Sequence, residues 1–335
     1  MKKKIYISIM SVIVSISALM MLTSWGMWGH QHINKAAVFA LPDELRIFFY
    51  NHIDFITEES NIPDLRKYTL NDKAENPRHY IDIEDFGNKP IDSLAQTSKL
   101  AYTKYDSKML QSSGILPWYI QDVMEKLTKS MQNKRKTEIL FLAADLGHYL
   151  ADAHMPLHTS SNHNGQLTNQ TGIHAFWEAQ LPEKFGEQYN VHTANAQYID
   201  DVTKETWRII KQSHELADTL LAKERELRKT FPADKIFMKD ENGKIIKNKF
   251  NQSVYTKEYS ELYHKALNGM IENQLRGAIT ATANFWYTAW VNAGKPDLKS
   301  LDDEGLTKRN KSNYKKDIKA WEKGKVTLLK AESEF

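Results

Sequence analysis

The fold is decided by residues 140–158, which read LFLAADLGHYLADAHMPLH. Drawn as a helix, this segment carries apolar side chains around most of its circumference, so it belongs in the core of the protein. Pro156 cannot continue a helix and places the residues after it in a loop. We therefore predict a buried helix that ends just before Pro156.

The same segment carries side chains that bind metals. His148 and Asp152 lie four residues apart and share one helix face, and His158 can return toward them from the loop. A single pair at this spacing is most often a surface pair, but His174 and Glu178 repeat it. The sequence has no cysteine, so any zinc must be held by imidazole, carboxylate or backbone groups.

Helical periodicity extends through most of the chain on either side of this segment. Apolar residues at 33–40 predict a first helix, and residues 206–229 and 258–292 predict further long helical segments. Asn242-Gly243 between short apolar runs predicts a small β-hairpin over 237–250. Strands do not alternate with helices, so we expect an all-α fold with a small β-hairpin insertion.

The N-terminal residues differ from the rest of the chain in charge and hydropathy. The 335 residues carry a formal net charge of +3, too small to indicate nucleic acid by itself. Lysines at 2–4 and an apolar run at 5–22 are typical of an export signal, which we place at residues 1–24 with cleavage before Trp25. Because the apolar run is long, an uncleaved membrane anchor is the competing interpretation.

Further candidate ligands precede the central helix. Asp64 and His79 lie upstream, and the mature chain would begin with Trp25-Gly-Met-Trp-Gly-His30. Together with the central segment and the motif GIHAFWE at 172–178, this pattern resembles the zinc-dependent phospholipase C and single-strand-specific nuclease superfamily. It is most similar to bacterial zinc-dependent phospholipase C-like proteins. The resemblance covers residues 25–178 and implies their multi-helix fold.

The resemblance also implies three zinc ions, each with its own ligands. The first zinc would be held by Asp64, His79, His148 and Asp152. The second would be held by His158, His174 and Glu178. The third would be held by the amino group and carbonyl of Trp25, by His30 and by the other oxygen of Asp152.

Zinc has no redox chemistry, so the implied reaction is hydrolysis of a phosphate ester. A water shared by two metals becomes a hydroxide that attacks phosphorus, and the family suggests that catalytic Asp64 receives its proton. Asp82 and Asp145 are candidates for orienting ligand imidazoles, and Tyr80 stands where nucleases stack an aromatic ring on a base. We expect the other histidines to be surface or core residues.

The two branches of the superfamily differ in substrate, and the sequence mixes their features. The spacings from Trp25 to His30 and from Asp64 to His79 resemble the nucleases. Glu178, the short gap from His158 to His174, the hairpin and the lack of disulfides resemble the phospholipases. The sequence favours a phospholipase C-like phosphodiesterase that contacts a membrane surface. The alternative is a single-strand-specific nuclease and 3′-nucleotidase. No protein partner is implied.

Two interpretations from other classes have less support. A non-catalytic, exported zinc-binding protein would have closed metal sites, which rarely use three ions. A nucleic-acid-binding module is disfavoured because the aromatic residues follow core spacing rather than alternating with Lys and Arg. We therefore expect a zinc-dependent phosphoesterase domain at 25–296 and a basic tail at 297–335. Within the tail, the Lys-rich residues 308–330 are expected to form a solvated or frayed helix.

Overall fold

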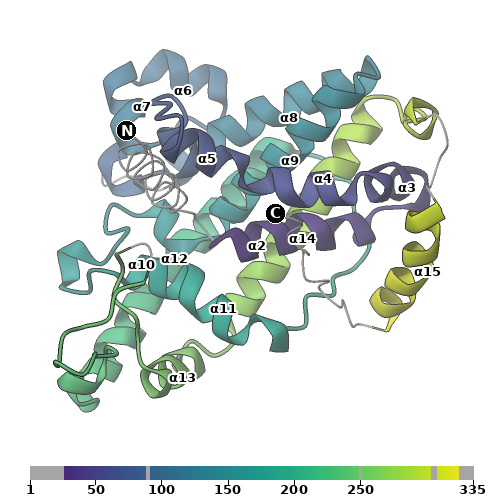
Figure 1. Ribbon diagram of the computed structural model, residues 1–335. Helices are drawn as coiled ribbons and strands as arrows, with labels where there is room; N and C mark the ends of the chain where they lie inside the picture. Colours follow the sequence, from purple (N-terminus) through teal and green to yellow (C-terminus); the bar gives the residue numbers. More distant parts are fainter. Residues whose placement is uncertain (1–25, 88–90, 249–250, 303–307, 324–335) are drawn as a thin grey trace, which may run out of the picture.

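A computed structural model describes residues 26–87, 91–248, 251–302 and 308–323 (Figure 1). The expected signal at 1–24 and Trp25 lie outside these residues. The described chain is built from helices without a β-sheet, which confirms the all-α class. The α-helices are α2 (Gly26–Ala40), α3 (Asp43–Asn51), α4 (Ile53–Glu58), α5 (Ile62–Tyr68), α6 (Ser98–Lys104), α7 (Ser107–Ser113), α8 (Leu116–Gln132), α9 (Lys136–Ala153), α10 (Ile173–Ala175), α11 (Leu181–Phe185), α12 (Val202–Thr230), α13 (Lys257–Ala266), α14 (Met270–Asn292) and α15 (Lys308–Glu322).

Short helical turns connect these elements. One of them, η7 (Phe176–Gln180), is a π-helix. The others are the 3-10 turns η1 (Glu59–Asn61), η2 (Asn76–His79), η3 (Ile83–Phe86), η4 (Ile91–Ser93), η5 (Pro156–Thr159), η6 (Gln166–Thr168), η8 (Gly186–Gln188), η9 (Ala233–Lys235) and η10 (Lys299–Leu301).

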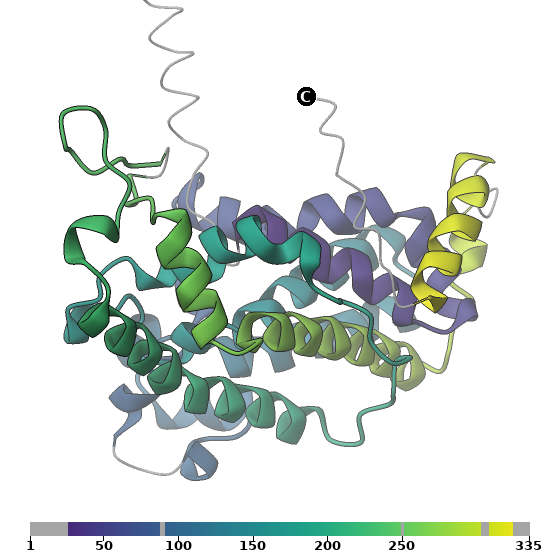
Figure 2. The ribbon, with the colours of Figure 1, turned by 90° about the horizontal axis from the view of Figure 1, so that it is seen from below.

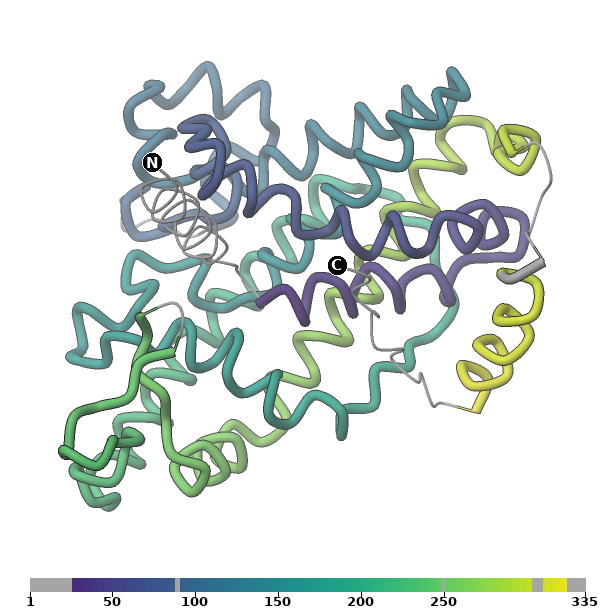
Figure 3. Tube along the Cα trace, in the orientation of Figure 1, coloured from purple at the N-terminus to yellow at the C-terminus, as the bar shows by residue number. Residues whose placement is uncertain are grey.

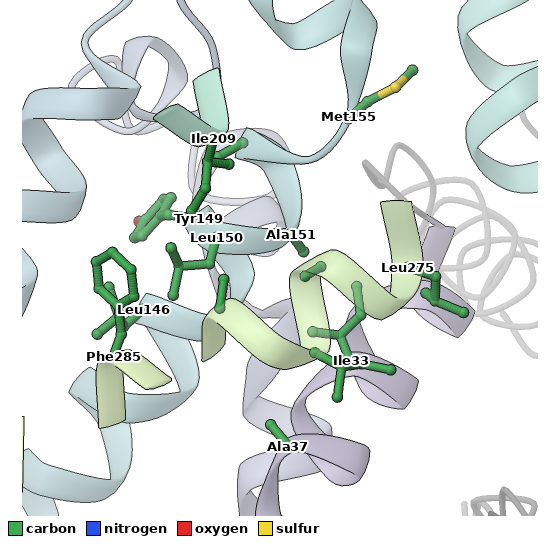
Figure 4. Packing of buried hydrophobic residues seen from close by; sticks show 14 of the residues in the cluster. Ile33, Ala37, Leu146, Tyr149, Leu150, Ala151, Met155, Ile209, Leu275 and Phe285 are labelled. Atoms are coloured by element: carbon green, nitrogen blue, oxygen red, sulfur yellow. The ribbon is translucent and has the colours of Figure 1, made fainter. Parts of the chain in front are cut away.

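Helix α9 is the buried helix that the sequence predicts, and it ends at Ala153, before Pro156. It packs against α8, α2 and α14. Figure 4 shows Leu146 and Leu150 of α9 in one apolar cluster with Ile33 of α2 and Leu275 of α14, all of them fully buried. Burial of apolar surface from four helices stabilises α9 on every side.

Helices α2 and α14 pack against each other and cross in the middle of the molecule (Figure 3). Seen from below, α2 and α11 lie on one side of α14 and α12 lies on the other (Figure 2). Trp286 of α14 is fully buried, stacks on Phe49 at 4.9 Å between ring centroids, and donates its indole N–H to the Ala143 carbonyl at 3.0 Å. This contact joins α14 to both α3 and α9.

Two expectations about local structure were wrong. The segment 258–292 is not one helix, because Asn268 and Gly269 both have positive φ and separate α13 from α14. The predicted hairpin over 237–250 forms no strands within the described residues: isolated antiparallel bridges join Phe237 to Tyr255, Lys239 to Ile245 and Lys247 to Ser253. Phe237 packs against the core, but Met238 is 43% and Ile245 is 36% exposed, so little burial supports a regular ladder beyond the base of the segment.

Helices α2 and α9 cross closely at Gly147, the residue before His148. A Cβ at Gly147 would lie 1.9 Å from Oδ1 of Asn34. The buried Asn34 amide donates to the carbonyls of Ile56 at 3.2 Å and Ala144 at 3.1 Å, tying α2 to α4 and α9. Only glycine leaves room for this amide.

We predict that Gly147→Ala destabilises the protein by about 1–3 kcal/mol, because the new methyl group displaces the Asn34 amide from its two acceptors. Urea unfolding followed by circular dichroism measures the difference. In an Asn34→Ala background the same substitution should cost much less, since the displaced group is gone. An equal cost in both backgrounds would contradict the proposed clash.

Candidate metal centre

Eight side chains that the sequence predicts as zinc ligands converge on one site. They form three groups, and within each group the ligand atoms lie within 4.8 Å of one another. Trp25, the remaining predicted ligand, lies outside the described residues. The groups are His30, His148 and Asp152; Asp64, His79 and His148; and His158, His174 and Glu178.

The first five of these side chains come from four elements around the end of α9. His148 and Asp152 project from one face of α9, since four residues make about one turn. Asp64 comes from α5, His79 from η2, and His30 from α2. All five are buried, so this part of the site lies inside the helical packing.

The last three side chains come from the segment after Pro156. His158 lies on η5, His174 on α10, and Glu178 on the π-helix η7. Nε2 of His174 lies 2.8 Å from a Glu178 oxygen, and Nε2 of His158 lies 3.7 Å from the other oxygen. π-Helical turns occur often at functional sites, where the wider turn re-aims side chains.

The carboxylate of Asp152 joins the groups. Its Oδ2 lies 2.9 Å from Nδ1 of His79 and 3.2 Å from Nε2 of His148. Its Oδ1 lies 3.4 Å from Nδ1 of His158 and 3.7 Å from Nε2 of His30. One buried carboxylate therefore presents a different oxygen to each side of the cluster.

Backbone carbonyls orient two of the imidazoles. Nδ1 of His148 donates to the carbonyl of Ser60 at 2.8 Å, and Nδ1 of His174 donates to the carbonyl of His163 at 2.8 Å. A ring that donates from Nδ1 keeps its Nε2 lone pair for a cation. Both Nε2 atoms point to carboxylates of the cluster, so both rings present a ligand atom to the site.

The donor set fits zinc. Both ring nitrogens of His30, Nδ1 of His158 and Oδ1 of Asp152 are buried without a hydrogen-bond partner among the described residues. Folded proteins seldom leave buried polar atoms unpaired, and a cation would bind these atoms. Imidazole nitrogen and carboxylate oxygen are the ligands that zinc takes where thiolates are absent.

Burial also sets the protonation states. It lowers the pKa of His30 and of His158 well below the usual value, so both rings are neutral at pH 7. Burial opposes the charge on His148, but Asp152 and Asp64 outweigh it and raise its pKa to about 9. A cation bound to His148 replaces that proton, so its affinity falls as the pH falls.

A sequence model of the S1/P1 nuclease family matches residues 25–284, which include the whole cluster. The chain belongs to the S1/P1 nuclease family. This family is part of the zinc-dependent phospholipase C and nuclease superfamily, so the resemblance seen in the sequence is confirmed. A direct comparison with curated proteins found no match.

Members of the S1/P1 nuclease family are zinc-dependent phosphoric ester hydrolases, and this chain is therefore an enzyme of that class. Proteins of the family are typically secreted. Within the described part of this chain, no helix is long and apolar enough to cross a membrane.

One residue beside the candidate ligands, Glu75, was not identified from the sequence. Glu75 is fully buried behind His79, with Oε1 3.5 Å from Nε2 of the ring. Arg66 and Arg78 donate to its other oxygen at 2.9 and 2.8 Å, and the Tyr149 hydroxyl donates to Oε1. Although burial opposes the charge, His79, Tyr149 and Arg66 outweigh it and lower the pKa of Glu75. An ionised Glu75 holds His79 so that Nδ1 faces the cluster.

Three residues were predicted to assist the candidate ligands, and each of them has different surroundings. Asp145 contacts Arg66 at 2.7 Å rather than an imidazole, and Arg66 in turn contacts Glu75. Asp82 has a buried Oδ1 without a hydrogen-bond partner in the described chain, and burial raises its pKa to about 7. The half-buried Tyr80 donates its hydroxyl to the Ser112 carbonyl at 3.0 Å.

The site also has a cation that the sequence did not reveal. Lys67 follows Asp64 by three residues on α5, and its ammonium lies 4.8 Å from the centre of the Tyr68 ring. Burial opposes its charge, but Tyr68, Asp64 and Asp152 outweigh it and raise the pKa of Lys67. A permanent positive charge therefore stands beside the cluster. The sequence shows that Lys67 follows Asp64 by three residues, but this spacing matches no pattern that predicts a functional lysine.

We predict that Glu75→Gln weakens binding of the zinc assigned to His79 by about 10–100-fold, because His79 loses its anionic partner. Zinc retained against a competing chelator measures the change. Asp145→Asn is the matched control, since Asp145 reaches His79 only through two other side chains. Equal zinc affinity in Glu75→Gln and the unmodified enzyme would refute this role.

Proposed function

We propose that this enzyme cleaves phosphodiester bonds in single-stranded nucleic acid. The matching family is a nuclease family, and this supports the nuclease alternative over the phospholipase C preference of the sequence analysis. One argument for the phospholipases was the hairpin over 237–250, which forms no strands in the described chain. The observation that carries the proposal is the match over 25–284, because it contains the complete cluster.

We assign three zinc ions to the cluster. Asp64, His79, His148 and Asp152 would hold one ion, and His158, His174 and Glu178 another. The third ion would bind Trp25, His30 and the second oxygen of Asp152.

The Trp25 assignment requires export with cleavage after residue 24, because only a free amino group binds metal well. We therefore propose that residues 1–24 are removed and that the mature enzyme comprises a catalytic domain at 25–296 and a basic tail at 297–335. Secretion is typical of the family and supports this proposal.

Zinc ions and the side chains of this protein would have separate roles in the reaction. Zinc at these ligands would supply an activated water and stabilise charge on the phosphoryl oxygens. Burial raises the pKa of Asp64, which favours its acceptance of a proton from the attacking water. The Lys67 ammonium attracts the phosphate and stabilises negative charge as it develops.

Tyr80 and Asp82 are proposed to contact a base beside the scissile phosphate. Tyr80 directly follows the ligand His79, and its ring has an aromatic face suited to stacking. Asp82 lies two residues further on and is half-buried, so its carboxylate can accept a hydrogen bond from a base amino group.

We predict that Lys67→Met lowers kcat by about 10²–10³-fold with unchanged zinc content, because one electrostatic stabiliser of the reacting phosphate is lost. Lys67→Arg keeps the charge and should retain most of the activity. Steady-state kinetics on a single-stranded oligonucleotide, together with elemental analysis, separates catalysis from metal loss. A fully active Lys67→Met would disprove the role.

A substrate panel tests the proposed function itself. The mature enzyme is offered single-stranded DNA, RNA, 3′-nucleotides and phosphatidylcholine, each with and without a chelator. We expect chelator-sensitive cleavage of the nucleic acids, which Asp64→Asn abolishes while the protein remains folded. Release of diglyceride and phosphocholine without nucleic-acid cleavage would instead establish the phospholipase C alternative.

A further inference from the structure

Helix α15 is not a solvated tail, because one of its faces packs on the domain. Trp321 is 5% exposed and lies between Phe39 of α2, at 6.0 Å between ring centroids, and His192, at 4.5 Å. Tyr314 packs edge-on against Tyr50 at 4.8 Å. The Tyr50 hydroxyl also donates to Asp317 at 2.6 Å, so α15 is anchored to both α2 and α3.

Another face of α15 carries a row of lysines that we call the lysine stripe: Lys311, Lys315, Lys319 and Lys323. They recur every four residues on or directly after the helix, and all four are exposed. Successive members are therefore about 6 Å apart along the helix axis and form one line.

The stripe places four ammonium groups in one row. Within the described residues, no carboxylate lies within 4.0 Å of any of its ammonium groups. Two of the four lysines on α12 differ, since Lys211 pairs with Asp92 at 3.2 Å and Lys229 pairs with Glu226 at 2.6 Å. Like charges four residues apart destabilise a helix, so packing of the opposite face has to hold the stripe in line.

We propose that the lysine stripe binds the phosphate backbone of a single-stranded nucleic acid while the metal centre holds another part of the same strand. This inference rests on the proposed nuclease function and adds a second contact for long substrates. A row of cations attracts a polyanion without reading its sequence, which is how single strands are commonly held.

A membrane surface fits the stripe less well. Amphipathic helices that bind membranes insert an apolar face between the lipids. In α15 that face is already occupied, because Trp321 is buried against Phe39 and Ile318 packs on the core cluster. Only the charged face remains for a partner, and it complements a soluble polyanion.

The position of α15 predicts a dependence on substrate length. His30 of the metal centre lies near the start of α2, and Phe39, which contacts α15, lies near its end (Figure 1). Nine residues of helix separate them by roughly 14 Å along the axis. A dinucleotide at the cluster cannot span that separation, whereas an oligonucleotide of some twenty residues can.

The test replaces all four stripe lysines with glutamine. Binding of a fluorescent oligonucleotide of about twenty thymidines is measured against salt in the Asp64→Asn background, which prevents cleavage. Each lost phosphate contact should reduce the slope of log K against log[salt] by roughly 0.7, or about 2.8 for four. In the active enzyme, KM for the long strand should rise roughly tenfold with kcat unchanged, and dinucleotide kinetics should not change.

Two matched variants serve as controls. Replacing Lys204, Lys211, Lys223 and Lys229 of α12 with glutamine removes the same charge from another exposed helix and should leave the slope unchanged. Replacing the stripe lysines with arginine keeps the charge and should restore KM. Thermal unfolding of each variant verifies that α15 remains docked.

The outcomes separate this inference from the proposed function. Cleavage of single strands with an unchanged salt slope and KM in the stripe variant would overturn the inference alone. Stripe-dependent binding without cleavage of any nucleic acid would overturn the proposed function alone. Stripe-dependent binding to vesicles of anionic phospholipid, with no effect on oligonucleotides, would assign the surface to a membrane and refute the inference.

Discussion

The Asp152 carboxylate is fully buried among four imidazoles, and the arrangement of the site depends on it. A buried charge costs several kcal/mol unless opposite charges or donors surround it. One oxygen faces His79 and His148, and the other faces His30 and His158. Helix α9 can place this carboxylate in the core only because α2, α8 and α14 cover it with apolar surface. The packing that stabilises the fold therefore also creates the water-poor site in which cations bind strongly.

Around this carboxylate, the protein fixes orientation with groups that never reach a substrate. The Ser60 and His163 carbonyls select the ring nitrogens that face the cluster, and Glu75 supports His79 from behind. The Lys67 ammonium stands beside the carboxylates of the cluster and offsets part of their negative charge. Such an arrangement suits a reaction whose substrate brings its own negative charge, as a phosphodiester does.

Much of this could be predicted from the sequence, because metal ligands and core helices leave spaced patterns. Residues 140–158 predicted the buried helix, which the structure confirms. They also predicted His148, Asp152 and His158 as candidate ligands, and the structure brings these together with five other predicted side chains. Glu75 could not be assigned, because its role depends on Arg66, Arg78 and Tyr149 meeting it in space. Trp321 was hidden among lysines, whose number suggested a solvated tail. The break at Asn268-Gly269 was readable as a turn signal, but strong helical periodicity on both sides obscured it.

We infer that these buried imidazoles and carboxylates hold zinc. Anomalous X-ray diffraction at the zinc edge, from crystals of the mature enzyme grown with zinc, locates any bound ions. We expect three peaks: one among Asp64, His79 and His148, one among His158, His174 and Glu178, and one beside His30. Crystals of the active, zinc-supplied enzyme with no anomalous density among these side chains would contradict it.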